Sequence, residues 1–338
     1  MRKRIGLKTL AAELGVDVST VSRALRDDPR VKSETRRAVR DLARHYDYRP
    51  NAAARALRGG KSGRVAVLLS PPQQRFASPI FLELLSTLDQ QLRDEGLNLA
   101  VFAARARDEE AEIVRQIVDE GLADALVLGR TRKDDPRVRY LLDVGVPFIT
   151  FGTTDWIDQH PTVEIDYAHA GRLAIRALAA ERIHILSAPE GLNFADNYVR
   201  GAVEEAASLG LPAPQIWRIE MTEEVGAETA ARILADGGRP AFACIQDSLA
   251  FGVFGAAAAL DLAVGRDLTV FGGQNFPGSE YTAPPLSTFS TEDRRVADLL
   301  SQVMLRHLEA NGARPLDGYE HHEIQPTPLL RQSHKLVR

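Results

Sequence analysis

LKTLAAELGVDVSTVSRALR, residues 7–26, determines the fold of the first part of the chain. Apolar residues recur at helical spacing up to Leu14 and predict a short first helix. Gly15 ends that helix, because glycine adopts a left-handed backbone at little cost, and Asp17 is placed to cap a second helix. Val21 would face the first helix, which leaves the N-terminal end of the second helix exposed. Such a helix-turn-helix presents that end to the major groove of DNA, although an ordinary helical hairpin is the alternative.

The charge of the chain is unevenly distributed. Residues 1–64 contain 17 Lys and Arg against 7 Asp and Glu, a net charge of +10, whereas the remaining residues contain 25 against 39, a net charge of −14. A basic first part favours contact with phosphate, and an acidic body disfavours it. Because the hydrophobic content is 44% and the charged content 26%, the composition is that of an ordinary soluble protein.

Cys244 is the only cysteine, so no internal disulfide can form and a reducing compartment is expected. In the N-terminal segment MRKRIGLKTLAAELGV, Lys8 and Glu13 interrupt the apolar region that a signal peptide requires. No apolar run is long enough to cross a bilayer. The sequence therefore predicts a cytoplasmic protein without a membrane partner.

Residues 29–46, PRVKSETRRAVRDLARHY, predict a third helix that completes a small helical core. The next segment, 48–63, holds Tyr48-Arg49-Pro50-Asn51 and then a helix-favouring stretch followed by glycines. That stretch is only about two turns long, and a helix so short should be mostly unfolded alone in water. The segment is either a hinge helix or a plain linker.

From Arg64 onward, short apolar runs alternate with segments of helical period. Strands are expected at 64–70, 98–104, 124–129, 146–152, 162–167, 183–188, 216–221, 241–246, 268–273 and within 319–331. Helices are expected at 79–96, 109–120, 137–145, 194–209, 226–235 and 293–309, with two others ending at Leu178 and Leu262. This alternation is typical of the α/β class, in which helices flank parallel sheets.

The predicted domains are a three-helix helix-turn-helix domain at 1–47, a hinge helix and linker at 48–63, and a two-lobed body at 64–338. The first lobe should comprise about 64–161 and 290–322, and the second about 162–289 and 323–338. A ligand is expected between the lobes, because ligands bind outside the carboxyl ends of strands in such sheets.

Several motifs in this order resemble the lactose-repressor (LacI-type) family of bacterial transcription regulators. They are TLAAELGVDVSTVSRAL at 9–25, YRPN at 48–51, DSLAFG at 247–252 and PPLST at 284–288. The resemblance covers nearly the whole chain. It implies a DNA-binding head on a two-lobed, periplasmic-binding-protein-like body.

The resemblance also implies which residues contact DNA. These are Thr9, Val18, Ser19, Thr20, Ser22 and Arg23 in the helix-turn-helix, and Asn51, Ala54, Arg55 and Leu57 in the hinge helix. In the family, two hinge helices pair across a homodimer and enter the minor groove at the centre of a pseudo-palindromic operator. Leu57 would be the apolar wedge that kinks the duplex, and the short helix would fold only on DNA.

The effector contacts implied by position are Ser70, Gln73, Phe81, Arg130, Gly152, Tyr198, Asp247 and Gln274. Many members carry arginine where this chain has Tyr198, and aspartate where it has Gln274. Both departures remove charge, so a neutral sugar is the expected small-molecule effector. Arg130 could supply a bidentate donor or could be a solvated surface residue.

We therefore expect a transcriptional regulator, and more specifically a repressor, whose operator affinity a carbohydrate controls. The alternative is a sugar-binding transport receptor without DNA activity. An enzyme is not expected, because the sequence has no P-loop, no G-x-S-x-G elbow and no H-E-x-x-H. No cofactor and no metal are expected, since His321 and His322 are adjacent rather than four residues apart.

Overall fold

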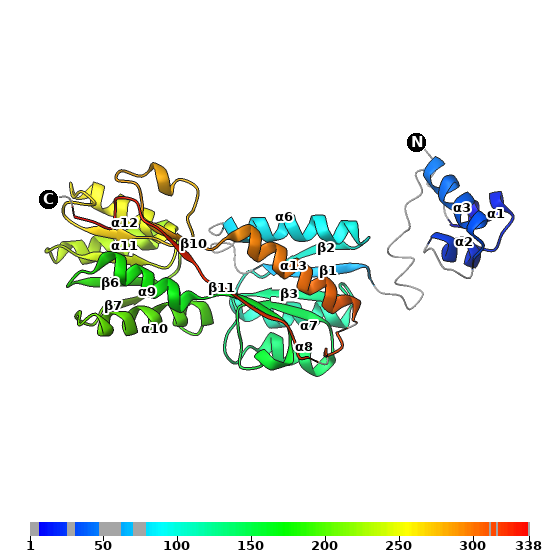
Figure 1. The fold of residues 1–338 in the computed structure, drawn as a ribbon, viewed down its shortest axis with the longest axis horizontal. Helices are drawn as coiled ribbons and strands as arrows, with labels where there is room; N and C mark the ends of the chain where they lie inside the picture. Colours follow the sequence, from blue (N-terminus) through cyan, green and yellow to red (C-terminus); the bar gives the residue numbers. More distant parts are fainter. Residues whose placement is uncertain are drawn as a thin grey trace. The chain divides into compact units, whose positions relative to one another are not determined.

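The computed structural model describes residues 7–25, 31–46, 62–69, 79–310, 312–315 and 317–336 (Figure 1). The chain divides into two units, Met1–Ser62 and Gly63–Arg338. The expected hinge helix, residues 50–58, lies outside the described residues.

The first unit contains α1 (Leu7–Leu14), α2 (Val18–Leu25) and α3 (Ser33–His45). Gly15 has a φ of 61°, as the left-handed end of α1 requires, and α2 begins directly after Asp17. The third helix, expected within residues 29–46, runs from Ser33 to His45.

The core of this unit is small and aliphatic. Leu10, Val21 and Val39, one from each helix, have no exposed surface. The Tyr46 hydroxyl, just after α3, donates a 2.7 Å hydrogen bond to the Glu13 carboxylate of α1. Each helix is thus fixed to the other two, which sets the angle at which α2 is presented.

The first lobe of the second unit is a parallel six-stranded sheet with helices on both faces (Figure 1). Its strand order is β11-β5-β4-β3-β1-β2. The bounds are β1 Arg64–Leu69, β2 Asn98–Ala103, β3 Ala125–Gly129, β4 Phe148–Phe151, β5 Thr162–Ile165 and β11 His321–Ile324. Helices α6 (Pro79–Asp94) and α13 (Asp293–Glu309) cover one face, and α7 (Glu110–Asp119) and α8 (Pro136–Val144) cover the other.

The second lobe repeats this plan on four parallel strands in the order β7-β6-β8-β9. The strands are β6 Ile183–Ser187, β7 Gln215–Arg218, β8 Ala241–Cys244 and β9 Thr269–Phe271. The helices are α9 Tyr167–Leu178, α10 Asn193–Ser208, α11 Glu223–Ala235 and α12 Asp247–Ala259. Helices α9 and α10 pack together on one face, and α11 and α12 on the other. Three single turns of 3-10 helix, at Arg107–Glu109, Ile157–Gln159 and Ser279–Tyr281, lie in connections.

The chain passes between the lobes after β5, after β10 (Thr288–Ser290) and after β11. The lobe boundary predicted at 162 is therefore one strand too early, because β5 pairs with β4 and β11 in the first sheet. The expected last strand is two strands, β11 and β12 (Thr327–Leu329), and β12 pairs antiparallel with β10. Pro326 stands between them and has no N–H for a ladder.

The α/β fold class with helix-flanked parallel sheets is confirmed. Across the described residues, the structure has no helix with the length and apolarity needed to span a membrane.

Replacement of Gly15 by alanine should destabilise the first unit by about 1–2 kcal/mol, because alanine resists the left-handed backbone. Apart from its chain neighbours, no atom of the described residues lies within 4 Å of a Cβ placed there, so the effect is one of backbone strain. Hydrogen exchange of the α1 and α2 amides in the full chain measures the change. Gly15→Asn is the matched control and should lose less stability, since asparagine tolerates the left-handed backbone better than alanine does. Equal losses in both variants would contradict the backbone explanation.

Candidate functional site

The helix-turn-helix unit presents part of the expected DNA contacts. Thr9 is exposed on α1, and Thr20 is half-buried on α2. Val18 is also half-buried and packs partly against the core of the unit, so only part of its apolar surface is available to a base. Positions 19, 22 and 23 share one helical face by their spacing, opposite the buried Val21 and Ala24. The side chains of Ser19, Ser22 and Arg23, and all of Asn51, Ala54, Arg55 and Leu57, lie outside the described residues.

A cavity lies between the two lobes of the second unit, at the carboxyl ends of strands from both sheets. The cavity has a volume of about 100 Å³. The described lining residues are Val67, Leu68, Leu69, Phe81, Leu84, Val127, Gly129, Arg130, Phe151, Gly152, Thr153, Glu164, Ile165, Tyr167, Asn193, Phe194, Met221, Gln246 and Gln274.

Half of the expected effector contacts line this cavity. They are Phe81, Arg130, Gly152 and Gln274. Ser70 and Gln73 lie outside the described residues. Tyr198 and Asp247 do not line the cavity, because both are fully buried elsewhere in the second lobe.

The backbone at Arg130 is fixed by a buried ion triad. Arg130 has a φ of 52°, which is unusual for a residue with a side chain. The Arg137 guanidinium donates to the carbonyl oxygens of Gly129 (3.1 Å) and Arg130 (3.3 Å). That guanidinium is itself paired with Asp135 at 2.6 Å and Glu110 at 3.0 Å. The triad therefore orients the end of β3 from which Arg130 enters the cavity.

Arg130 supplies positive charge to the cavity. Burial and the neighbouring Arg107 lower the pKa of Arg130 to about 10, so it remains protonated at neutral pH. Arg107 also reaches the second lobe, where its Nη2 lies 3.5 Å from Oε1 of Glu220. An ion pair thus bridges the lobes close to Arg130.

Asn193 joins the two lobes at the cavity wall. It is the first residue of α10 in the second lobe, and its backbone N–H donates to Thr131 O at 3.0 Å. Its Nδ2 donates to Thr153 O at 2.9 Å and to Thr153 Oγ1 at 2.6 Å. Gly152 permits this arrangement, because its φ is 111° and a Cβ there would lie 2.6 Å from Thr131 Oγ1.

Glu164 is a cavity residue that our sequence analysis missed. Its Oε2 accepts a 3.1 Å hydrogen bond from Thr153 Oγ1. Burial raises the pKa of Glu164 to about 7 against the opposing effect of that hydrogen bond, and the negative charges of Glu323 and Asp166 add to the rise. An acidic residue inside the apolar run TVEIDY at 162–167 was the available signal.

A row of polar side chains forms the wall contributed by the second lobe. The Gln274 Nε2 donates to the Tyr167 hydroxyl at 2.6 Å, and the Gln246 Nε2 donates to Gln274 Oε1 at 3.0 Å. Ser248 Oγ donates to Gln246 Oε1 at 3.0 Å. These bonds fix the orientation of the Gln274 amide.

Asp247 holds the loop that carries Gln274. Its carboxylate has no exposed surface and accepts bonds from the backbone N–H groups of Gly273 (2.6 Å) and Phe276 (2.7 Å). The hydroxyls of Ser279 and Thr288 donate to it as well. Burial outweighs these bonds and raises the pKa of Asp247 to about 6. Asp247 is therefore a positioning residue for Gln274 in this structure.

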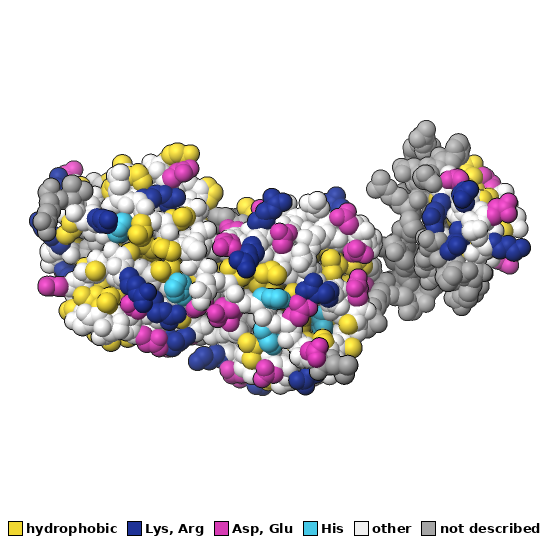
Figure 2. Space-filling model, viewed as in Figure 1, with side chains coloured by type: hydrophobic (Ala, Val, Ile, Leu, Met, Phe, Trp, Pro, Cys, Tyr) yellow, Lys and Arg dark blue, Asp and Glu magenta, His cyan; other side chains and the backbone are white. Residues whose placement is uncertain are grey.

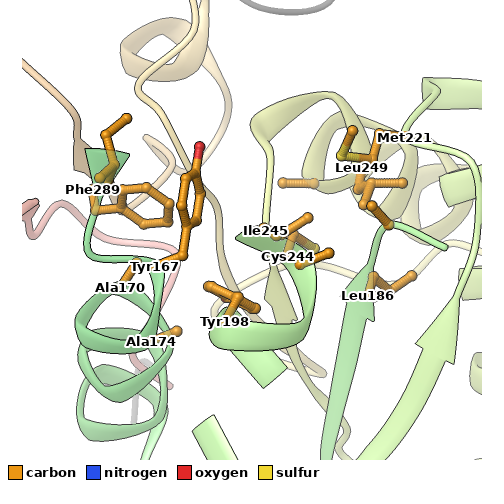
Figure 3. Close-up of a cluster of buried hydrophobic side chains, with 14 of the residues drawn as sticks. Tyr167, Ala170, Ala174, Leu186, Tyr198, Met221, Cys244, Ile245, Leu249 and Phe289 are labelled. Atoms are coloured by element: carbon orange, nitrogen blue, oxygen red, sulfur yellow. The ribbon is translucent and has the colours of Figure 1, made fainter. Parts of the chain in front are cut away.

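Tyr198 belongs to the core of the second lobe. Its ring lies among Tyr167, Phe289 and Cys244 (Figure 3), with a centroid distance of 6.4 Å to Phe289. The hydroxyl is buried and has no hydrogen-bond partner among the described residues. Burial raises the pKa of Tyr198 well above its ordinary value. The ring fills space between helix and sheet.

Replacement of Tyr198 should separate the role of its ring from that of its hydroxyl. Tyr198→Ala should lower the free energy of unfolding by about 3–5 kcal/mol, because a large cavity remains. Tyr198→Phe should change it by less than about 1 kcal/mol, because the hydroxyl contributes no hydrogen bond to the described residues. Urea unfolding of the full chain measures both. A loss in Tyr198→Phe as large as in Tyr198→Ala would reveal a partner for the hydroxyl.

Replacement of Glu164 by glutamine should stabilise the chain at high pH. The folded pKa of about 7 lies above the ordinary value of 4.5, so the wild type loses stability relative to the variant as pH rises from about 4.5 to 7. The gain should reach about 1–3 kcal/mol at pH 8 and vanish near pH 4. Unfolding at both pH values measures it, with Glu228→Gln, at an exposed position of α11 in the second lobe, as the control. A gain that is equal at both pH values would refute the ionisation argument.

Among the described residues, no group of His, Cys, Asp and Glu side chains is arranged to hold a metal ion. On the face of the second unit shown in Figure 2, acidic and basic side chains are interspersed.

Comparisons with known proteins agree with this organisation. Residues 6–51 match a family model described as bacterial regulatory proteins, lacI family, and residues 177–334 match a periplasmic binding protein-like domain. The HTH-type transcriptional regulator AglR of Rhizobium meliloti (strain 1021) is 32% identical over 275 residues, which cover 79% of this chain and 76% of AglR.

Solved structures agree in fold. A structure of the Lac repressor dimer bound to operator and the anti-inducer ONPF has a TM-score of 0.82 at 19% identity, covering 98% of this chain and 100% of that chain. A transcriptional regulator CelR–cellobiose complex has a TM-score of 0.71 at 20% identity, with the same coverage. The helix-turn-helix unit, the two-lobed body and the similarity to AglR together show that the chain belongs to the lacI family of bacterial regulatory proteins.

Proposed function

We propose that this DNA-binding transcriptional regulator is a repressor whose operator affinity is set by a small, uncharged carbohydrate bound between the lobes of its body. The observation that carries the proposal is the cavity. It combines aromatic rings with fixed hydrogen-bonding groups, in a chain whose other unit is a helix-turn-helix.

The chemistry of the cavity suits a sugar. A sugar ring has hydroxyls that both donate and accept hydrogen bonds, and C–H faces that pack on aromatic rings. Phe81, Phe151 and Phe194 supply the rings. Arg130 donates only, whereas the Glu164 carboxylate accepts only. An uncharged ligand with many hydroxyls can accept hydrogen bonds from Arg130 and donate them to Glu164.

The DNA contacts follow from the first unit and the segment after it. Positions 18–23 lie at the N-terminal part of α2, which a helix-turn-helix directs into the major groove. Asn51, Ala54, Arg55 and Leu57 would form the hinge helix, with Leu57 as a wedge in the minor groove. A pair of such segments needs a homodimer and a pseudo-palindromic operator. The two structural neighbours, an operator-bound Lac repressor dimer and a CelR–cellobiose complex, are in accord with these partner classes.

The effector would act through the lobes. Ligand contacts that differ between two lobe arrangements would favour one of them, and the hinge segments of the dimer would then order or separate. The change in operator affinity can be no larger than the difference in effector affinity between the two states. The protein would act in the cytoplasm, where operator DNA lies, and would bind its sugar without transforming it.

The test uses the full chain. Repeated selection from a random duplex library should yield a pseudo-palindromic sequence, and neutral sugars should then change the affinity for it. A chain that binds sugars but retains no duplex at low salt would instead be a solute receptor. A chain that hydrolyses the sugars it binds would be an enzyme.

Arg23→Ala should weaken binding to the selected operator by about 1–3 kcal/mol if Arg23 contacts a base edge, and should relax the sequence preference at that position. Binding to random duplexes should change much less. Titration by fluorescence anisotropy at fixed salt measures both affinities. Arg37→Ala, which removes an exposed charge from α3, is the control and should leave the preference intact. An unchanged preference in Arg23→Ala would remove Arg23 from the base contacts.

A further inference from the structure

The cavity has an acidic end that the expected effector contacts do not explain. Glu164 on β5 and Arg130 after β3 both line it. Strand β4 lies between those two strands in the sheet, so the backbones that carry the two charges are separated by roughly 10 Å. A ligand in the cavity therefore meets a cationic donor at one end and an acidic acceptor at the other.

The carboxyl group of Glu164 is held in place but not neutralised by the described residues. Thr153 Oγ1 donates to Oε2 at 3.1 Å, and the same hydroxyl oxygen accepts from Asn193 Nδ2 at 2.6 Å. The described charges that act on Glu164 are those of Glu323 on β11 and Asp166 before α9, and both are acidic. An incoming anion would add to this repulsion.

The same geometry ties Glu164 to the contact between the lobes. A threonine hydroxyl has a single hydrogen to donate. When that hydrogen points to an ionised Glu164, the oxygen lone pairs are left for Asn193, which belongs to the second lobe. A ligand that keeps Glu164 ionised therefore also favours the bond across the lobes.

We propose that Glu164 selects an uncharged, hydroxyl-bearing effector by accepting hydroxyl hydrogen bonds at the end of the cavity opposite Arg130. This inference rests on the proposed function, because it requires that the effector occupies this cavity. Glu164 would thereby discriminate neutral sugars from acidic ones. The family resemblance gave this role to no acidic residue on β5.

The proposal has a signature in the pH dependence of binding. Hydroxyl donors favour the ionised carboxylate, and the ligand-free pKa of Glu164 is about 7. Effector affinity should therefore rise by about tenfold between pH 6 and pH 8. Removing the negative charge of Glu323 should move the midpoint of this rise to lower pH, because that charge helps to raise the pKa of Glu164.

The experiment measures sugar binding to the full chain by thermal shift and then by calorimetry at pH 6, 7 and 8. The probes are glucose, galactose, maltose, sucrose, cellobiose and raffinose as neutral sugars, glucosamine as a cation and glucuronate as an anion. The variants are Glu164→Gln, Glu164→Asp and the control Glu323→Gln. Unchanged affinity for the selected operator verifies that each variant is folded.

We expect a neutral sugar to bind the wild type with the tenfold pH dependence, and glucuronate to bind at least tenfold more weakly. Glu164→Gln should lose affinity by tenfold or more at pH 8 and show a flat profile. Glu164→Asp should bind weakly but keep the pH dependence. Glu323→Gln should keep the wild-type affinity at pH 8.

Three results would overturn the inference while leaving a sugar effector in place. They are wild-type affinity in Glu164→Gln, a flat pH profile in the wild type, and a preference for glucosamine that Glu164→Gln abolishes. The wild-type profile decides the question even if Glu164→Gln fails to fold. Failure of every probe to bind would instead refute the carbohydrate effector itself, and this inference with it.

Discussion

The hydrogen bonds of Asn193 to Thr131 and Thr153 are the contact on which the cavity depends. Each lobe has its own sheet, and the lobes meet at the edges where the strands end. At that meeting point the first residue of α10 bonds to the first lobe, beside apolar side chains of both lobes that belong to one continuous buried cluster. Hydrogen bonds of this kind contribute little net free energy, on the order of 1 kcal/mol each.

Buried charges fix the backbone around the cavity rather than contacting its contents. Arg137 with its two carboxylates orients the end of β3, and Asp247 orients the loop that carries Gln274. A buried ion pair adds little stability by itself, because desolvation opposes the attraction. Here the buried charges act on geometry, because they hold the carbonyl and N–H groups that they bind in one position. The side chains at 130 and 274 are thereby presented in fixed directions.

Sequence reasoning predicted the parts of this protein that periodicity controls. The helix-turn-helix, the order of strands and helices and the cavity at their ends all follow from apolar spacing. It did not predict which face a single residue takes: Tyr198 turns into the core, and Asp247 binds a loop. Glu164 was missed because an acidic residue in a strand usually faces solvent. Strand β10, of three residues, was missed, and β12 was merged with β11 into one expected strand.

The return of the late segments to both lobes has a consequence for synthesis. Helix α13 and strand β11 complete the first lobe. Residues 327–334 close the second lobe, where Ser333 Oγ donates a hydrogen bond to the carbonyl oxygen of Val270 in β9. The helix-turn-helix, by contrast, is built from one continuous segment that ends by residue 46. On the ribosome the DNA-binding unit can fold first, while neither lobe is whole until nearly all of the chain has emerged. The DNA-binding unit would thus be complete before the chain could bind a ligand between its lobes.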